Sequence, residues 1–229
     1  MNFDYVSLEN CSSATGTVIV IDVLRAFSTA AYALQRGVTS ICLVSGVQEA
    51  LDLKTLNPDW LVMGEVQGLP PAGFDLGNSP TQLLERDLSG RTMVQRTSAG
   101  TQGVVLTAKA EVLLAASFVV AGATVRYALK TNPTRVTFVL TGGANCAEDL
   151  ACADYLSERF NGRMPDSAPF IRRVFAAEDA ARHLDPAQPE FPRSDLDYCT
   201  RIDAFPFAMP VTREAQGLVL HAVLPDPVN

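Results

Sequence analysis

The first two-thirds of the chain alternates short continuous apolar runs with longer segments whose apolar residues recur at helical spacing. A short apolar run is typical of a strand that is buried on both faces, and a longer periodic segment is typical of an amphipathic helix. We expect strands over residues 17–23, 40–44, 60–66, 92–97, 111–117 and 135–140, and helices over residues 26–35, 47–56, 80–86, 119–130 and 147–161. This alternation predicts an α/β fold built on a mostly parallel sheet with helices on both faces.

The last third of the chain has a different pattern, because seven prolines lie between positions 165 and 210. Proline interrupts helices and central strands, so we expect an irregular C-terminal extension from about residue 165 to residue 229. Within it, residues 175–184 have a helical pattern, and residues 205–211 and 218–223 are expected to form a β-hairpin around Gly217. No internal repeat or clear linker divides the sequence, so residues 1–229 are expected to form a single α/β domain.

The loops that follow the expected strands carry the candidate chemistry, because right-handed crossovers place such loops along one edge of a parallel sheet. Asp22 interrupts an apolar strand near its end, where a carboxylate is costly unless it is paired or binds a metal. Arg25 stands at the start of the next helix, whose N–H groups favour anions, and Ser28 and Thr29 can reach the same space. An Asp22–Arg25 pair that only caps the helix explains this segment equally well.

Glu65 also lies near the end of an apolar strand, where it can either hold a ligand or pair with an arginine. The loop that follows is long, rich in glycine and proline, and places Asp75 between two apolar residues. Long ordered loops of this kind are often functional. At the end of the loop, Ser79 suits a helix N-cap and Pro80 suits the first helical position, which accounts for Asn78, Ser79 and Pro80 without any function.

A glycine-bearing turn with the sequence RTSAGTQG follows the expected strand 92–97. Its hydroxyls and backbone N–H groups can form a nest for phosphate, which makes Thr97, Ser98, Gly100 and Thr101 candidate substrate contacts. The spacing fits neither the GxxxxGK[ST] phosphate loop nor the GxGxxG dinucleotide loop, so the pattern by itself is weakly specific.

Glu148 and Asp149 stand in the first turn of the expected helix 147–161, after a second glycine-rich turn. They either interact with the helix dipole or help to hold a cation. Together with Asp22, Glu65 and Asp75 they can converge at one edge of the sheet. Oxygen ligands without histidine favour Mg²⁺ over zinc, so we expect Mg²⁺ as cofactor, with these five carboxylates as candidate ligands.

Composition narrows the choice of partners and location. The net charge is −7 and no basic run can follow a phosphate backbone, so we expect no nucleic-acid partner. The five cysteines include no C-x-x-C pair and suit a reducing compartment. Residues 112–123, the longest apolar-rich stretch, are too short to span a membrane, and the N-terminus has no signal-peptide pattern. We expect a cytoplasmic protein, no membrane partner, and a homodimer as the commonest assembly.

The two histidines, His183 and His221, stand in contexts typical of surface or packed positions. This weakens mechanisms that rely on a Ser-His pair or on a histidine-rich zinc centre. No dinucleotide fingerprint follows any strand, so a nicotinamide dehydrogenase is the least favoured function.

Five segments occur in a characteristic order along the chain: IDVLRAFSTA, the GE at positions 64–65, PPAGFDLGNSP, RTSAGTQG, and TGG followed by AED. Through them the chain resembles the 2-phosphosulfolactate phosphatase family from about residue 18 to residue 156, and more weakly beyond. The resemblance implies an α/β fold peculiar to that family and a Mg²⁺-dependent phosphatase. The implied substrate is 2-phospho-3-sulfolactate, which gives 3-sulfolactate on a route to coenzyme M. Two segments, TSAGT at 97–101 and Val66-Gln67-Gly68, depart from the family pattern and bear on the identity of the substrate.

Carried over by position, the resemblance places most of these candidates at one site. Asp22, Arg25 and Asp75 are expected to be catalytic, and substrate binding is expected from Ser28, Asn78, Ser79, Thr97, Ser98, Gly100 and Thr101. The nucleophile is either water or the carboxylate of Asp22. Water is preferred, because Leu24 stands where a D-x-D phosphatase has its second aspartate. Two alternatives remain: a phosphatase for another phosphorylated hydroxy acid, and a phosphoester-binding module that does not turn over.

Overall fold

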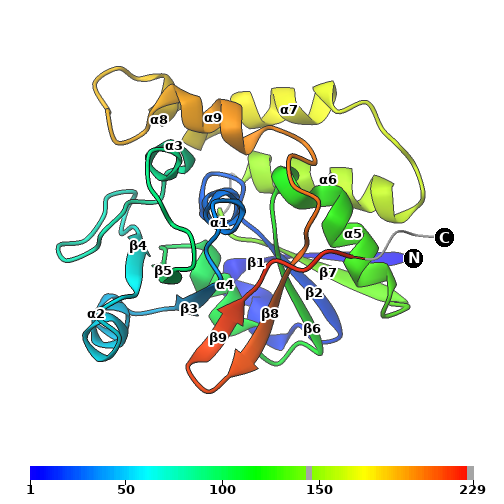
Figure 1. Ribbon diagram of the computed structural model, residues 1–229. Coiled ribbons are helices and arrows are strands. Elements are labelled where there is room, and N and C mark those ends of the chain that lie inside the picture. The colour runs from blue at the N-terminus through cyan, green and yellow to red at the C-terminus, as the bar shows by residue number, and fades with distance from the viewer. Residues whose placement is uncertain (143–145, 226–229) are drawn as a thin grey trace.

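The computed structural model describes residues 1–142 and 146–225, which form an α/β fold around one nine-stranded sheet (Figure 1). The strands lie in the order β1-β7-β2-β6-β8-β9-β3-β5-β4. Their bounds are β1 Asn2–Ser7, β2 Thr17–Ile21, β3 Ser40–Val44, β4 Leu61–Gly64, β5 Thr92–Arg96, β6 Val112–Ala116, β7 Arg135–Leu140, β8 Met209–Glu214 and β9 Gly217–Leu220.

The sheet consists of two parallel groups joined by an antiparallel hairpin. Strands β1, β7, β2 and β6 form one parallel group, and β3, β5 and β4 form the other. The β8–β9 hairpin pairs antiparallel with β6 on one side and with β3 on the other. The C-terminal extension therefore supplies the two strands that join the groups, which makes it an integral part of the sheet.

Alternate residues of the central strands point into different hydrophobic clusters. Val18 and Val20 of β2 belong to one cluster, whereas Ile19 and Ile21 of the same strand belong to another. Because successive side chains of a strand point to opposite faces, both faces of the sheet are buried. This explains why the sequence of β2 is a continuous apolar run, which is typical of parallel strands that are covered on both faces.

Helices cover both faces of the sheet, as expected. Helices α1 and α4 pack with the first cluster, whereas α5, α6 and α7 pack with the second. The bounds are α1 Ala26–Gln35, α2 Val47–Leu56, α3 Pro80–Leu84, α4 Gly100–Leu106, α5 Ala121–Leu129, α6 Ala147–Phe160, α7 Ala168–Phe175, α8 Glu178–Leu184 and α9 Arg193–Cys199, with 3-10 turns η1 Leu8–Ser13 and η2 Phe118–Val120. Figure 1 shows α8 and α9 next to α3, above the start of α1. Among the residues described, no helix combines the length and apolar character needed to cross a membrane.

Most expected elements are confirmed, and the differences have physical reasons. The turn expected at residues 98–103 is wrong, because α4 begins at Gly100. The glycines there permit close packing: a Cβ at Gly103 would lie 2.7 Å from Cγ1 of Val20. The hairpin is confirmed with shifted strands, since the outer half of β8 is polar and exposed. Of the expected turn at residues 141–145, positions 143–145 lie outside the described residues.

Three further elements have no counterpart in the sequence analysis. β1 is an edge strand that is only partly buried, so it lacks the continuous apolar run of the inner strands. Helix α9 and most of α7 lie in the proline-bearing third of the chain, where prolines stand at the start of both helices. Proline is tolerated in the first turn of a helix, so the extension contains short helices despite its frequent prolines.

Candidate active site

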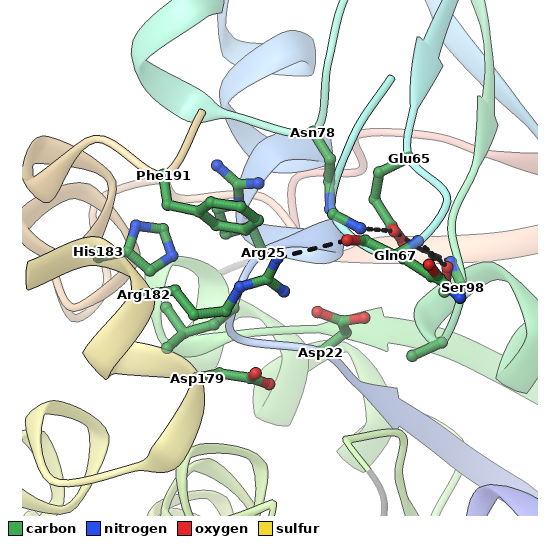
Figure 2. Close-up of a pocket in the computed structure, with 13 residues that line it drawn as sticks. Asp22, Arg25, Glu65, Gln67, Asn78, Ser98, Asp179, Arg182, His183 and Phe191 are labelled. Carbon is green, nitrogen blue, oxygen red and sulfur yellow. Dashed lines mark hydrogen bonds between the residues drawn. The ribbon is translucent and has the colours of Figure 1, made fainter. Parts of the chain in front are cut away.

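A cavity of about 170 Å³ lies where the carboxyl ends of both parallel groups meet (Figure 2). The loops after β2, β4 and β5 line one part of it, and α8 with the loop before α9 lines the rest. The lining residues are Asp22, Leu24, Arg25, Glu65, Gln67, Gly68, Asn78, Ser98, Ala99, Asp179, Arg182, His183 and Phe191. The candidate loops thus come together as expected, but from two groups of strands.

Close contact between the starts of α1 and α4 brings the two groups together. A Cβ at Gly100 would lie 2.7 Å from Oδ2 of Asp22 and 2.8 Å from Cβ of Ala26. Below this contact, the buried side chain of Gln95 in β5 donates a hydrogen bond of 2.9 Å to the carbonyl oxygen of Ala26. Gly100 is therefore required for the approach of the two loops, and it does not itself line the cavity.

Asp22 is the central carboxylate of the site. Its side chain is 6% exposed, and Oδ1 accepts a hydrogen bond of 2.9 Å from the N–H of Ala26 in the first turn of α1. Burial, with a smaller contribution from the nearby Glu65, raises the pKa of Asp22 to about 6, although the Ala26 N–H acts to lower it. A carboxylate kept at such a pKa in a cavity is a candidate for binding a cation or taking part in proton transfer.

Arg25 does not pair with Asp22, which removes the simple capping pair as an explanation of this segment. Its guanidinium forms a buried ion pair of 2.8 Å with Asp195 of α9 and donates a second bond of 3.0 Å to the carbonyl oxygen of Glu190. Asp195 is fully buried, and its Oδ1 accepts bonds from the hydroxyl of Ser79 and from the N–H and hydroxyl of Thr81. Asp195 therefore fixes Arg25 against the N-terminus of α3.

Glu65 holds the loop after β4 against the loop after β5. Oε2 accepts bonds from the N–H of Gly68 at 2.6 Å and from the hydroxyl of Ser98 at 3.0 Å, and Oε1 accepts the N–H of Ser98. The Ser98 hydroxyl also accepts the N–H of Gln67. The carboxylate does not pair with an arginine, since Arg96 bonds to the backbone carbonyl of Glu65. Glu65 and Ser98 lie at the cavity as expected, and their mutual bonds set its shape.

Asn78 points into the cavity with an acceptor that has no partner. The side chain is 6% exposed, and no hydrogen bond reaches its Oδ1 within residues 1–142 and 146–225. Buried polar atoms are normally hydrogen-bonded, so the orphaned carbonyl oxygen of a residue that lines a cavity is a candidate ligand for a cation or a bound donor.

Four expected substrate contacts form hydrogen bonds within the protein and do not line the cavity. Thr97 and Thr101 are fully buried and bond to each other: the Thr101 hydroxyl accepts the Thr97 N–H at 2.8 Å, and the Thr97 hydroxyl accepts the Thr101 N–H at 3.0 Å. Ser28 donates to the carbonyl oxygen of Val23. Ser79 caps α3 and donates to Asp195, as its N-cap position predicts.

Asp75 lies outside the cavity, which disagrees with its expected place at the catalytic centre. Its carboxylate forms an ion pair with Lys54 of α2 and accepts the N–H of Val62 at 2.7 Å. The loop after β4 runs back alongside the strand, where Met63 bridges to Leu76. This path turns Asp75 towards α2 and leaves only Asn78, three residues later, at the cavity.

Glu148 and Asp149 are buried behind the cavity wall. Asp149 accepts the N–H groups of Val23, Thr141 and Gly142 at 2.9 to 3.1 Å, so it ties the loop after β2 to the loop after β7. Burial raises the pKa of Asp149 well above its usual value, and burial raises the pKa of Glu148 to about 7. Glu148 and Asp149 are not among the residues that line the cavity.

The expected set of five metal ligands is therefore not gathered in one place. Among the described residues, no three His, Cys, Asp or Glu side chains cluster closely enough to hold a metal ion by themselves. Protein-bound Mg²⁺, however, is commonly held by one or two carboxylates, with waters and substrate phosphate completing its coordination. Asp22 and Asn78 fit that mode, because both residues line one cavity and carry oxygen donors, and the Asn78 carbonyl oxygen has no hydrogen-bond partner among the described residues.

Four residues of the extension, Asp179, Arg182, His183 and Phe191, also line the cavity, and no sequence pattern predicted them there. Phe191 lies under two guanidinium groups, with the Cζ atoms of Arg182 and Arg25 at 3.7 and 4.6 Å from the ring centroid. His183 packs edge-on against Phe191, and its Nδ1 lies 3.1 Å from the carbonyl oxygen of Pro192. His183 is thus a packed residue that also lines the cavity, and burial lowers its pKa. Arg182 is the one arginine of the short helix α8, and its sequence context gave no signal of this arrangement.

Comparison with known proteins gives a consistent result. The sequence model of the family described as 2-phosphosulpholactate phosphatase matches residues 5–214. A Bacillus subtilis protein named "Probable 2-phosphosulfolactate phosphatase" is 31% identical over 209 residues, which is 90% of this chain and 91% of the relative. A Thermotoga maritima protein of the same name is 32% identical over 198 residues, covering 82% of this chain and 86% of the relative. A Thermus thermophilus protein of that name is 35% identical over 144 residues, covering 62% of this chain and 60% of the relative.

Proposed function

Because the chain belongs to the 2-phosphosulpholactate phosphatase family, we propose that it hydrolyses 2-phospho-3-sulfolactate to 3-sulfolactate and phosphate, with Mg²⁺ as cofactor. One observation carries the proposal: a buried carboxylate, Asp22, shares a cavity with the fixed guanidinium of Arg25. A preorganised cation next to an acidic group suits phosphoryl transfer, in which catalysis consists mainly of positioning and charge stabilisation. The place of this activity on a route to coenzyme M stays part of the proposal.

Arg25 is the residue that stabilises the charge of the transferring phosphoryl group. Its guanidinium is held by Asp195 and by the Glu190 carbonyl, so it does not need to reorganise when substrate binds. Its remaining N–H groups are available to phosphate oxygens, which a guanidinium binds in a fixed planar geometry.

Asp22 and Asn78 are the residues that would hold Mg²⁺, which supplies positive charge to the phosphate oxygens when it is bound. Asp22 also orients the attacking water and accepts its proton. The water oxygen forms a bond to phosphorus as the bond from phosphorus to the substrate C2 oxygen breaks, and the leaving C2 oxygen takes up a proton. Direct attack by the Asp22 carboxylate would form an aspartyl phosphate. Trapping a phosphorylated enzyme after acid quench separates the two, and we expect none.

The proposal is tested by phosphate release from 2-phospho-3-sulfolactate and from a panel of phosphorylated three- and four-carbon acids, with Mg²⁺ and with EDTA. We expect release that requires the metal and prefers the sulfonate. Metal-dependent release that prefers another acid would keep the chemistry and replace the substrate. No release from any of them by folded, Mg²⁺-supplied protein would contradict the proposal and favour a phosphoester-binding module.

We also propose that the protein acts in the cytoplasm as a homodimer. The five cysteines are free thiols, which supports a reducing location. Exposed apolar side chains in the last third, such as Met164 and Leu224, support an assembly. Light scattering on the purified protein measures the assembly directly, and a mass of one chain at working concentration would contradict the dimer.

A further inference from the structure

Two arginines face the cavity, and they differ in how their charge is balanced. Arg25 is 4% exposed and its charge is matched by Asp195. Arg182 is half-buried and forms no ion pair with any residue in the described ranges 1–142 and 146–225. Arg182 therefore brings a positive charge to the cavity that no protein carboxylate neutralises by direct contact.

The hydrogen bonds of Arg182 are few and long. Nε lies 3.5 Å from Oε1 of Gln188, and Nη2 lies 3.4 Å from the carbonyl oxygen of Gln67. Both acceptors are neutral, whereas charge-assisted bonds to carboxylates or phosphates are typically shorter and stronger. A guanidinium has five N–H donors, so most of the donor capacity of Arg182 remains for a ligand.

The guanidinium is nevertheless held in place. Its Cζ lies 3.7 Å from the centroid of Phe191, which is a close cation–π contact. Gly68 makes room for this contact, since a Cβ there would lie 2.4 Å from Cζ of Phe191 and 3.0 Å from Nη2 of Arg182. Asp179, one helical turn before Arg182, lines the same cavity without forming an ion pair with it. The arrangement is thus a supported guanidinium with open donors.

The position of Arg182 suits a second anionic group of a bound substrate. Figure 2 shows the Arg182 side chain extending from α8 into the cavity near Asp22, with a dashed line to Gln67, which lies next to Glu65 and Ser98. A phosphate next to Asp22 and Arg25 leaves the open N–H donors of Arg182 for another anionic group of the substrate.

We propose that Arg182, supported by Phe191, binds the anionic group of the substrate that is not the phosphate, a sulfonate or a carboxylate, and so determines specificity. This inference rests on the proposed phosphatase function. It assigns phosphate contact to Arg25 and substrate selection to Arg182. The class of substrate is accordingly a phosphomonoester of a small hydroxy acid with a second strong acid group near the phosphorylated carbon.

The test compares Arg182→Gln and Arg182→Lys with the wild type on three substrates in the presence of Mg²⁺. These are 2-phospho-3-sulfolactate, 2-phospholactate, which lacks the sulfonate, and glycerol 2-phosphate, which has only the phosphate. For Arg182→Gln we expect kcat/KM on 2-phospho-3-sulfolactate to fall roughly ten- to hundredfold, mainly through KM, which is the scale of losing charge-assisted hydrogen bonds. On glycerol 2-phosphate we expect a change of about twofold or less, and Arg182→Lys should lie between the two.

The pattern over substrates identifies the group that Arg182 binds. A loss confined to 2-phospho-3-sulfolactate assigns the sulfonate, and an equal loss on 2-phospholactate assigns the carboxylate. An equal loss on all three substrates, glycerol 2-phosphate included, would mean that Arg182 only supports the fold, and would overturn the proposal. No loss on any substrate would overturn it too. Arg201→Gln is the matched control, because Arg201 stacks on Tyr198 at 4.6 Å and does not line the cavity.

A binding measurement separates this inference from the proposed function. Calorimetric titration with 3-sulfolactate needs no turnover, and we expect the wild type to bind it at least tenfold more tightly than Arg182→Gln. Binding that depends on Arg182 without any phosphate release would keep the inference and contradict the phosphatase. Phosphate release together with equal 3-sulfolactate affinity in the wild type and Arg182→Gln would keep the phosphatase and contradict the inference about Arg182. The absence of both binding and turnover would overturn both.

Discussion

Two regions of the chain build the cavity, and they hold their charged groups differently. In the strand-end loops, Asp22 and Glu65 accept bonds from backbone N–H groups of their own or neighbouring loops. In the C-terminal extension, Arg182 rests on an aromatic ring with two long hydrogen bonds. The first arrangement fixes carboxylates to the backbone, and the second leaves a side chain open to its ligand. We infer that the loops carry the chemistry and that the extension carries selection, with Asp195 linking the two.

The largest effect is expected at Asp22. Asp22→Asn keeps an acceptor for the Ala26 N–H but removes the negative charge, so kcat/KM should fall about a thousandfold or more on every substrate. Thermal unfolding should show an unchanged or higher melting temperature, because a buried charge is removed. The matched control is Asp75→Asn, which breaks a partly exposed ion pair with Lys54 and should leave kcat/KM within about twofold. Near-normal turnover by Asp22→Asn would exclude Asp22 from the mechanism.

A smaller effect on turnover, with a large effect on stability, is expected at Asp195. Asp195→Asn retains acceptors for Ser79 and Thr81 but leaves Arg25 as an unpaired buried charge. Breaking a buried pair costs about 3–5 kcal/mol, which urea unfolding measures. Because Arg25 loses its orientation, kcat should fall roughly ten- to hundredfold, equally on substrates with and without a second anion. A selective loss on the second-anion substrates would instead place Asp195 with Arg182. Asp154→Asn, at the partly exposed pair with Arg173, is the control.

Substitutions at two glycines of α4, Gly100 and Gly103, distinguish an effect on packing from an effect on catalysis. Gly100→Ala puts a methyl group 2.7 Å from Oδ2 of Asp22, and Gly103→Ala puts one 2.7 Å from Cγ1 of Val20. Both substitutions overpack the core and should cost about 1–3 kcal/mol in unfolding experiments. Only Gly100→Ala displaces the central carboxylate, so only it should lower kcat, by about tenfold. An equal kcat for the two variants would show that the approach of α4 to Asp22 has no catalytic importance.

The smallest effect is a dependence of stability on pH. Burial raises the folded-state pKa of Asp22 to about 6 and of Glu148 to about 7, above the unfolded values near 4. The folded state therefore binds protons more tightly than the unfolded state, so these groups lower the free energy of unfolding as pH rises from about 4 to about 7. We expect the metal-free protein to be about 2 kcal/mol more stable at pH 5.5 than at pH 8, and Glu148→Gln to reduce this difference. A melting temperature that rises over this interval would contradict the prediction.

Much of the fold could be predicted from the sequence, because strands such as β2, β3 and β6 are short apolar runs that a helix follows. Helices α1 and α2 begin and end as predicted. The structure differs from the prediction where one sequence pattern, such as a pair of glycines, can have either of two physical causes. Gly100 and Gly103 were interpreted as turn residues, but they are helical positions selected for close packing.

The place of a residue in the candidate site could be predicted best where that residue closely follows the end of a strand. Asp22, Glu65 and Ser98 follow strand ends directly, so the ends of the strands bring them to the cavity. Asp75 lies in the middle of a long loop, and the path of that loop decides where it points. Asp195, Arg182 and Phe191 are more than a hundred residues from Asp22, on two short helices and the loop between them, so only the packing of the extension places them at the cavity.

The most direct test of the division between chemistry and selection measures phosphate release by the wild type, Asp22→Asn and Arg182→Gln on 2-phospho-3-sulfolactate and glycerol 2-phosphate, with Mg²⁺ present. We predict that Asp22→Asn lowers kcat/KM on both substrates by a similar factor and leaves their ratio unchanged. We predict that Arg182→Gln lowers kcat/KM only on 2-phospho-3-sulfolactate, so the ratio falls roughly ten- to hundredfold. Two variants that change the ratio alike, or an Arg182→Gln variant that loses both activities equally, would contradict the account.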